Sequence, residues 1–207
     1  MQALKVGVLA LQGAFLEHIN ILKRLPEVSS VIAIRNLEQL NSIDALIIPG
    51  GESTTMALIA ERAGLWESLK EFVHTKPTWG TCAGMILLAN EVFRTKAGGQ
   101  NLLGGLDITI DSFESFLDIK QISNPSHPFP ALFIRAPIIS SINSSDVEIL
   151  ASLNHNNDDV DTSTVVAVKQ GHIIATAFHP ELTHDDRIHK YFVTMSQDFY
   201  KTLNHHL

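Results

Sequence analysis

The fold of this chain is indicated most clearly by the stretch Pro77-Thr78-Trp79-Gly80-Thr81-Cys82-Ala83-Gly84-Met85-Ile86-Leu87-Leu88-Ala89. It begins as a short strand-like run, passes through the pattern Gly-x-Cys-x-Gly, and continues as an apolar helical segment. This order is typical of a nucleophile elbow, in which small residues let the chain turn sharply and present a reactive side chain above a sheet. The stretch therefore predicts an α/β fold with Cys82 at the elbow.

Cys82 stands where a helix begins, and this position suits a nucleophile. The N-terminal end of a helix dipole carries positive charge, which stabilises a thiolate. The backbone amide of Ala83 is predicted to point toward an oxyanion beside the sulfur. The alternative is a structural role, because an unpaired cysteine is most often a buried apolar residue. The elbow pattern taken alone favours catalysis only slightly over this alternative.

Short apolar runs alternate with segments of helical period in the first half of the chain. This alternation predicts a flavodoxin-like three-layer α/β/α arrangement, with a mostly parallel central sheet and crossover helices. Two helices should pack on the sheet through apolar residues at helical spacing. The strands are expected at residues 4–11, 30–35, 44–48 and 77–80, and the helices at residues 15–25, through Leu16, Ile19, Leu22 and Leu25, and 53–63, through Met56, Ile59 and Ala60.

The second half of the chain predicts additional antiparallel strands and few helices. Residues 169–172 resemble a tight hairpin turn, and residues 154–159 form a polar stretch that is expected to be an exposed loop. A closing helix is expected at residues 185–203 because its apolar residues recur at helical spacing. The strands are expected at residues 105–110, 113–119, 131–135, 147–152, 164–169 and 172–178.

Composition argues against several classes of protein. The 207 residues are 45% hydrophobic, enough for one core, so residues 1–207 are expected to form a single domain. The net charge of -7 argues against a nucleic-acid partner, which would require clustered basic residues. No apolar stretch reaches the roughly 20 residues of a membrane-spanning helix, so no membrane segment is expected. The single cysteine excludes an internal disulfide and favours a reducing compartment, so the cytoplasm is expected.

No metal or other cofactor is expected. Metal sites need histidine, cysteine or carboxylate ligands at short, characteristic spacings. The histidines outside the chemical motifs lack such spacing and are predicted to lie at the surface, among them His127, His155, His184, His205 and His206.

The second chemical signal is Ala177-Phe178-His179-Pro180-Glu181, at the end of the last predicted strand. On an extended chain, His179 and Glu181 would face the same side, so the carboxylate could orient the imidazole and stabilise its charged form. A histidine before a proline is more often an ordinary turn residue. Together with the cysteine elbow, however, the pair predicts a catalytic triad of Cys82, His179 and Glu181.

The third signal is a glycine-rich turn, Ile47-Ile48-Pro49-Gly50-Gly51-Glu52-Ser53-Thr54-Thr55. Its backbone amides could hold an anion, either an oxyanion or part of a substrate. The turn lacks both the Gly-x-Gly-x-x-Gly spacing and the Gly-Lys-Ser/Thr ending of nucleotide-binding loops. The alternative is a structural turn in which Ser53 or Thr54 caps the following helix.

Five segments in this order resemble the class I, triad-type glutamine amidotransferases, and more closely the glutaminase subunit of pyridoxal 5'-phosphate synthase. The resemblance extends over nearly the whole chain. The elbow and the His-Pro-Glu pair are shared across the amidotransferase class. The vitamin B6 branch is indicated by Leu-Gln-Gly-Ala at residues 11–14, Gly-Gly-Glu-Ser-Thr at 50–54 and Phe-Ile-Arg-Ala-Pro at 133–137.

The resemblance implies a glutaminase that supplies ammonia to a synthase subunit making pyridoxal 5'-phosphate. By this resemblance Cys82 attacks the side-chain amide of L-glutamine and forms a thioester. His179, oriented by Glu181, protonates the departing ammonia and then activates water.

The resemblance also implies binding residues. It assigns glutamine binding to Gly51, Glu52, Ser53, Ile134 and Arg135. It places Gln12 at the contact with the synthase subunit, close to an oxyanion site to which Gly50, Gly51 and Ala83 are expected to contribute.

The chain departs from the family pattern in one place. Family members usually carry Arg-Asn-x-Phe-Gly-Arg-Gln immediately before the Asp-Ser-Phe-Glu element, and one of these arginines helps to bind glutamine. Here Ile110 runs directly into Asp111, and no arginine lies between Arg94 and Arg135. Either the protein lacks this contact, or the sequence as written omits a loop.

Two other interpretations remain open at the level of sequence. A cysteine protein of the DJ-1/PfpI type also carries an elbow cysteine, but it lacks a strand-end His-Pro-Glu. A degenerate glutaminase that docks on the synthase with little turnover is the other alternative, and the complete triad argues against full loss of activity.

Overall fold

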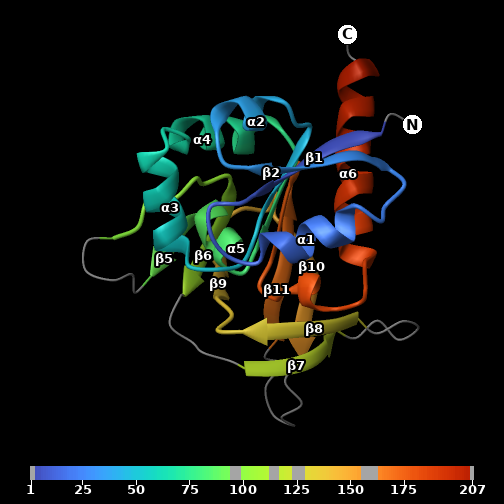
Figure 1. The fold of residues 1–207 in the computed structure, drawn as a ribbon. Coiled ribbons are helices and arrows are strands. Elements are labelled where there is room, and N and C mark those ends of the chain that lie inside the picture. The colour runs from blue at the N-terminus through green and yellow to red at the C-terminus, as the bar shows by residue number, and fades with distance from the viewer. Residues whose placement is uncertain (1–2, 94–98, 112–116, 123–128, 155–162, 206–207) are drawn as a thin grey trace.

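The computed structural model describes residues 3–93, 99–111, 117–122, 129–154 and 163–205. At its centre lies a seven-stranded sheet of order β10-β11-β12-β4-β3-β1-β2 (Figure 1). Neighbouring strands from β12 to β2 are parallel, whereas β11 and β10 are added in antiparallel fashion. The order β2-β1-β3-β4 followed by a further parallel strand is the flavodoxin-like order, as predicted. The strands are β1 (Leu4–Leu9), β2 (Val28–Ile34), β3 (Ala45–Ile48), β4 (Thr78–Thr81), β10 (Glu148–Asn154), β11 (Ser163–Gln170) and β12 (Ile173–Thr176).

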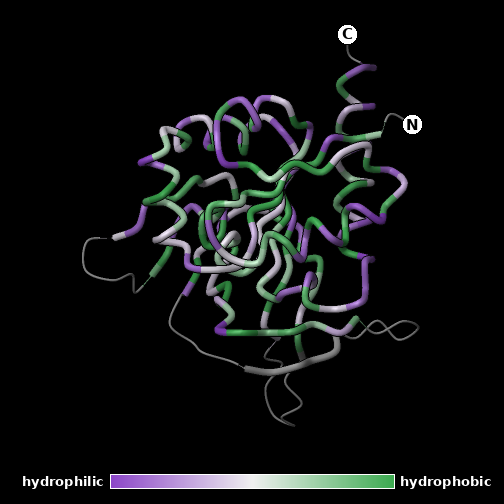
Figure 2. Tube along the Cα trace, viewed as in Figure 1, coloured by the Kyte–Doolittle hydropathy of each residue, from purple (hydrophilic) through white to green (hydrophobic). Residues whose placement is uncertain are grey.

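Helices cover both faces of the central sheet because its strands are apolar on both sides. Alternate residues of β3 enter two different hydrophobic clusters, Leu46 and Ile48 into one and Ala45 with Ile47 into the other. Figure 2 shows the central strands as mostly hydrophobic and the polar residues toward the outside. The first cluster contains residues of α2 (Leu37–Asn41), α3 (Ser53–Arg62), α4 (Trp66–Thr75) and α5 (Ala83–Leu88), and the second contains residues of α1 (Phe15–Leu22) and α6 (Arg187–His205).

The first half of the chain departs from the prediction at several boundaries. Strand β1 ends at Leu9, not at residue 11, and α1 ends at Leu22. Leu16 was predicted to pack on the sheet, but 57% of its surface is exposed. Helix α4 was not predicted, although its buried residues Trp66, Leu69, Phe72 and Val73 have helical spacing. Helix α2 was also not predicted.

The second half of the chain contributes two small sheets, and the predicted antiparallel strands are confirmed. One sheet has the order β5-β6-β9, and the other pairs β7 with β8. Strands β5 and β9 were not predicted. The strands are β5 (Ala89–Phe93), β6 (Leu106–Asp111), β7 (Leu117–Ile122), β8 (Phe129–Ile134) and β9 (Ile138–Ile142).

The predicted hairpin turn and closing helix are also confirmed. Gln170 pairs with Ile173 across the turn, and Gly171 supplies the positive φ of 57° that such a turn requires. Helix α6 runs from Arg187 to His205 and buries Phe192. The polar stretch at 155–159 and the start of the strand predicted at 113–119 lie outside the described residues. None of the described helices is long and apolar enough to cross a membrane.

Candidate active site

The predicted triad lies at the edge of the sheet where its parallel strands end. Cys82 directly follows β4, Gly50 comes two residues after β3, and His179 comes three residues after β12. Because β3, β4 and β12 are parallel neighbours, their carboxyl ends meet. A Cβ atom on Gly50 would lie 2.3 Å from Cε1 of His179 and 3.4 Å from Cβ of Cys82. Gly50 therefore touches both side chains, and only glycine fits there.

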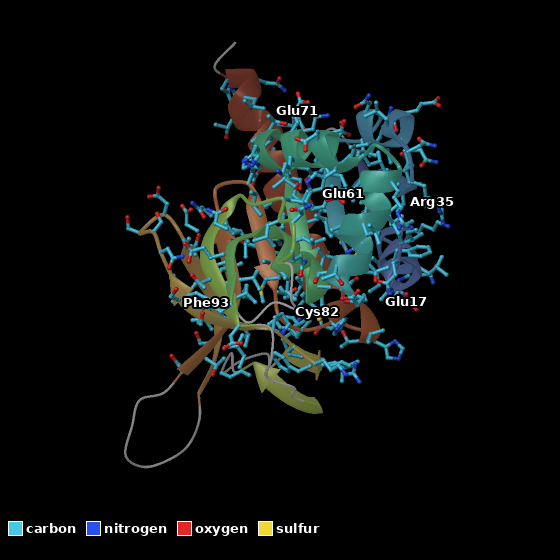
Figure 3. The ribbon with its side chains drawn as sticks, turned by 90° about the vertical axis from the view of Figure 1, so that its left-hand side faces the viewer. Glu17, Arg35, Glu61, Glu71, Cys82 and Phe93 are labelled. Carbon is cyan, nitrogen blue, oxygen red and sulfur yellow. The ribbon has the colours of Figure 1, made fainter. Side chains whose placement is uncertain are left out.

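Close backbone packing shapes the elbow. Cys82 has φ 48° and ψ -104°, a conformation that non-glycine residues rarely adopt, and its N–H donates to the Thr176 carbonyl at 2.8 Å. A Cβ on Gly84 would lie 2.1 Å from the backbone oxygen of Ile48, and one on Gly80 would lie 2.5 Å from the Gly84 backbone. The Gly-x-Cys-x-Gly pattern is thus a requirement of packing. Cys82 is buried, whereas the acidic residues labelled in Figure 3 are exposed.

The elbow places the sulfur beside β8. Cys82 is 6% exposed, and its Sγ lies 3.9 Å from the carbonyl oxygen of Ile134. Ala83 follows as the first residue of α5 and is buried. Among the described residues no group of three or more histidine, cysteine, aspartate or glutamate side chains is arranged to hold a metal ion.

His179 and Glu181 are joined as the sequence predicts, but on a different backbone. Nδ1 of His179 lies 2.7 Å from Oε1 of Glu181, and both residues are buried. The extended chain that was predicted for this pair is wrong, because strand β12 ends at Thr176 and residues Pro180–Leu182 form the 3-10 helix η1. Pro180 suits the first position of a helix, where no N–H is needed. The His179 N–H donates to the Leu132 carbonyl at 2.8 Å and fixes this segment to β8.

The electrostatics of His179 favour a protonated ring. Burial lowers the pKa of His179, but hydrogen bonds to Cys82 and Glu181 and the charges of both groups outweigh it and raise the pKa to about 10. At neutral pH the ring is therefore an imidazolium. One of its N–H groups donates a hydrogen bond to the Glu181 carboxylate, and the other carries a proton that can be transferred.

The glycine-rich turn is fastened to the loop after β1. The Gln12 side chain accepts a hydrogen bond from the Glu52 N–H at 2.8 Å, and the Ala14 N–H donates to the Gly50 carbonyl at 3.0 Å. Gly13 has φ 89°, and a Cβ there would lie 1.9 Å from the Gly50 oxygen. The predicted closeness of Gln12 to Gly50 and Gly51 is thus present in the structure.

Glu52, not Ser53 or Thr54, caps α3. Its carboxylate accepts from the Thr55 N–H at 2.9 Å and from the hydroxyls of both Thr54 and Thr55. Ser53 is buried and donates to the Gln100 side chain at 3.1 Å. The alternative interpretation of this turn, in which Ser53 or Thr54 caps the helix, is therefore wrong.

The remaining predicted binding residues, Ile134 and Arg135, differ in their exposure. Ile134 ends β8 and its carbonyl contacts the Cys82 sulfur, whereas the side chain of Arg135 is exposed and its backbone has φ 46°. The stretch before Asp111, where the family usually carries arginine, forms the last part of β6 and pairs with β9. The Ser-Phe-Glu element that follows lies outside the described residues.

The sequence interpretation missed three buried polar residues behind Glu181. His18 of α1 lies with Nε2 3.4 Å from Oε2 of Glu181, and its Nδ1 lies 2.9 Å from Nε2 of His189 in α6. Thr81 of β4 is the third residue, with Oγ1 3.4 Å from Nε2 of His18. A signal was present, because His18 stands four residues before the buried Leu22 and therefore shares its apolar face.

The fold is that of the class I glutamine amidotransferases, and it brings Cys82, His179 and Glu181 together. The model of the SNO glutamine amidotransferase family matches residues 8–198, and the chain belongs to this family. This membership removes the DJ-1/PfpI alternative.

Relatives and a solved structure agree with this family. The chain is 44% identical over 222 residues to the probable pyridoxal 5'-phosphate synthase subunit PDX2 of Arabidopsis thaliana, covering 93% of this chain and 86% of that protein. It is 42% identical over 206 residues to the pyridoxal 5'-phosphate synthase subunit PdxT of Dehalococcoides mccartyi, covering 95% and 99%. A crystal structure of a glutamine amidotransferase matches with a TM-score of 0.76 at 37% identity, covering 93% of this chain and 98% of that one.

Proposed function

We propose that this chain is the glutaminase subunit of a pyridoxal 5'-phosphate synthase, with Cys82, His179 and Glu181 as its catalytic residues. It hydrolyses L-glutamine to L-glutamate and ammonia, and the ammonia passes to a synthase subunit. The observation that carries the proposal is the buried 2.7 Å contact between His179 and Glu181 beside the elbow cysteine. The relatives, which are subunits of pyridoxal 5'-phosphate synthase, support the synthase as the partner.

The first half of the reaction uses the charged pair of Cys82 and His179. The thiolate attacks the side-chain amide carbon of glutamine, and the amide oxygen becomes an oxyanion. Donors expected for this oxyanion are the Ala83 N–H and an amide of the Gly50-Gly51 turn. The carbon–nitrogen bond then breaks, the nitrogen takes the proton of the His179 imidazolium, and ammonia leaves behind a thioester.

The second half of the reaction needs neutral His179 as a base, and formation of the thioester lowers the pKa of this ring. Acylation removes the thiolate whose hydrogen bond and charge help to raise the His179 pKa, so the ring now holds a proton less tightly. Neutral His179 accepts a proton from water as that water attacks the thioester carbon. The carbon–sulfur bond breaks, the thiolate and imidazolium are restored, and glutamic acid leaves and ionises.

Glutamine is held by the segments that surround the sulfur. We assign binding to Gly51, Glu52 and Ser53 after β3, and to Ile134 and Arg135 at the end of β8, where the Ile134 carbonyl already contacts Sγ. The arginine that family members usually place before Asp111 is missing from the sequence. One charge-assisted hydrogen bond to the substrate is then absent, which weakens glutamine binding by about 1.5 to 3 kcal/mol.

The test is to measure glutamate release from L-glutamine by the chain alone and with a synthase subunit. We expect turnover with the synthase, and none after Cys82→Ala or Cys82→Ser in protein that keeps its circular dichroism spectrum. A folded Cys82→Ala variant that releases glutamate at the wild-type rate would remove the assignment of Cys82. A wild-type chain that binds the synthase without turnover would indicate a docking subunit instead.

A further inference from the structure

A chain of buried polar side chains extends from Glu181 away from the cysteine. It consists of His18 on α1 and His189 on α6, with Thr81 of β4 beside them. His18 Nε2 lies 3.4 Å from Glu181 Oε2, and His18 Nδ1 lies 2.9 Å from His189 Nε2. The reaction outlined above uses none of these three side chains.

The surroundings of this chain are apolar. His18, His189 and Thr81 have no exposed surface, and the ring of Trp79 meets the two histidines edge-on at centroid distances of 5.3 Å and 4.8 Å. A polar group in such a place is costly unless it forms a hydrogen bond. Their presence in an apolar layer therefore indicates a role beyond filling space.

Both histidines are neutral. Burial, with the nearby charges of His189 and His179, holds the pKa of His18 well below its usual value. Burial lowers the pKa of His189 to about 3, with Arg24 adding to the effect and Asp186 opposing it. A neutral imidazole has one N–H donor and one acceptor nitrogen, so each ring has to point its donor in one direction.

The contacts decide that direction. Among the described residues, Oε2 of Glu181 and Nδ1 of His189 have no hydrogen-bond partner. If His18 carried its proton on Nδ1, His189 would have to accept at Nε2, which would leave a buried N–H on its Nδ1 without an acceptor. The Nε2 lone pair of His18 would then also face the carboxylate. With protons on both Nε2 atoms, His189 donates to His18, His18 donates toward Glu181, and only an acceptor nitrogen is left without a partner.

We propose that His18 is a positioning residue for the triad, donating from Nε2 to the second carboxylate oxygen of Glu181 while His179 donates to the first. His189 fixes the tautomer of His18 from behind. Glu181 is then held by one N–H on each oxygen, so its plane, and through it the His179 ring, is set. The contact of 3.4 Å tightens when the site is occupied, as catalytic hydrogen bonds often do. The inference rests on the proposed function, because it assigns His18 to the same triad.

Two substitutions at one position separate this role from packing. The amide nitrogen of glutamine can occupy the place of Nε2, whereas that of asparagine can occupy only the place of Nδ1. In the complex with the synthase subunit, we expect His18→Asn to lower kcat for glutamine hydrolysis roughly tenfold with little change in KM, the loss of one hydrogen bond to a charged group. His18→Gln should keep most of the activity. Equal losses in the two variants, or a loss confined to KM, would overturn the proposal.

Thr81→Val is the matched control, because it removes the hydroxyl that also lies near Nε2 of His18. The Thr81 hydroxyl also lies 3.4 Å from His18 Nε2, and valine keeps its shape. We expect Thr81→Val to leave kcat near the wild-type value. A loss as large as that of His18→Asn would make the hydroxyl, and not Glu181, the partner of His18, and the proposal would be wrong.

A tautomer measurement keeps the test independent of turnover. In the wild-type chain labelled with ¹⁵N-histidine, NMR should show His18 and His189 each protonated on Nε2 only. Protonation of His18 on Nδ1 would contradict the proposal even if every variant folded and reacted as expected. If the wild-type complex released no glutamate, the proposed function would fail, while this spectrum would still decide how His18 faces Glu181.

Discussion

The His179 ring lies between two regions that are built in different ways. On the nucleophile side, made of Cys82, Gly50 and Gly84, the backbone determines the geometry. A Cβ on Gly50 would enter the His179 ring, and one on Gly84 would enter the Ile48 carbonyl. An added Cβ at either glycine would overlap its neighbours, so a substitution there should displace the His179 ring or the backbone.

The carboxylate side, made of Glu181, His18 and His189, is held by side chains instead. Its three residues come from η1, α1 and α6 and meet through polar atoms in a buried, apolar setting. Such a network can be weakened one contact at a time. The two sides should therefore fail differently, the first by displacement of the site and the second by loss of its alignment.

The largest expected contrast is between His179→Asn and Glu181→Gln. Histidine carries both proton transfers, while the carboxylate orients the ring and stabilises its charge. By analogy with other triads, we expect losses in kcat of about 10⁶ for His179→Asn and about 10⁴ for Glu181→Gln. Glutamate release by the synthase complex measures both. If Glu181→Gln were as damaging as Cys82→Ala, the carboxylate would have a larger role than orientation.

Partner dependence gives the next largest effect and concerns the nucleophile side alone. Uncoupled hydrolysis would waste glutamine and lose ammonia, so the free chain should be weakly active. The Gly50 carbonyl accepts from the Ala14 N–H, and Gln12 holds the Glu52 N–H, so the loop after β1 controls the orientation of the turn. We expect the synthase to press on this loop and to reorient one amide toward the oxyanion, with a gain of about 10² to 10³ in rate.

Gln12→Ala should remove most of that gain while Cys82 stays reactive toward a thiol probe. The matched control is Gln39→Ala, because Gln39 also accepts from a backbone amide, that of Arg35, but lies in α2, which carries none of the proposed site residues. We expect the control to be activated like the wild type. Full activity of the isolated chain, unchanged by the partner, would show that the oxyanion site is already formed.

Two glycine substitutions should divide activity from stability. Gly50→Ala meets the His179 side chain, which can move, so we expect a loss of about 10² in rate from a misplaced ring. In Gly84→Ala the added Cβ would clash with backbone atoms of Ile48, which cannot move aside as a side chain can. We therefore expect the free energy of unfolding in urea to fall by about 1 to 3 kcal/mol. Gly171→Ala is the control, since nothing lies within 4 Å of its added Cβ and only its positive φ is strained. Equal effects of Gly50→Ala and Gly84→Ala on stability would erase the distinction.

The nucleophile side and Glu181 could be predicted from the sequence, whereas the two histidines behind Glu181 could not. Gly-x-Cys-x-Gly is a local pattern whose spacing follows directly from a sharp turn, so the elbow, the parallel sheet and the triad could be predicted. His18 and His189 are 171 positions apart and meet only through the packing of α1 and α6. Each alone resembles a polar residue at a helix surface, and only the tertiary fold brings their rings together.

Local competition explains the smaller errors. Glu52 was not predicted as the cap of α3 because serine and threonine are the more usual N-cap residues. Its longer side chain reaches the Thr55 N–H and both neighbouring hydroxyls. His179 and Glu181 were predicted to lie on one side of a strand, and they do meet, but through the turn of η1 that Pro180 begins.

The last expected effect is the pH dependence of stability, in which the two sides have opposite signs. On the carboxylate side, the pKa of His18 is lowered, and that of His189 falls to about 3, by burial above all. Below pH 6.5 these two histidines bind protons in the unfolded chain but stay neutral in the folded chain, so the free energy of unfolding falls as the pH falls. On the nucleophile side, the His179 pKa of about 10 lies above its usual 6.5. Its stabilisation is complete below pH 6.5 and is lost as the pH rises through 10.

The free energy of unfolding in urea should therefore pass through a maximum near neutral pH. The acid limb of this curve belongs to the carboxylate side and the alkaline limb to the nucleophile side, and substitutions test this assignment. Each proton taken up or released changes the slope by about 1.4 kcal/mol per pH unit. We expect His179→Asn to flatten the limb between pH 7 and 9.5 and to leave the acid limb unchanged. His189→Asn should reduce the slope between pH 4 and 6 and leave the alkaline limb as it was. Measurements stay below pH 10 because Tyr200, whose pKa is raised to about 12 by burial, adds a further loss above that pH. If both variants altered the same limb, His179 would not be the boundary between two independently built regions.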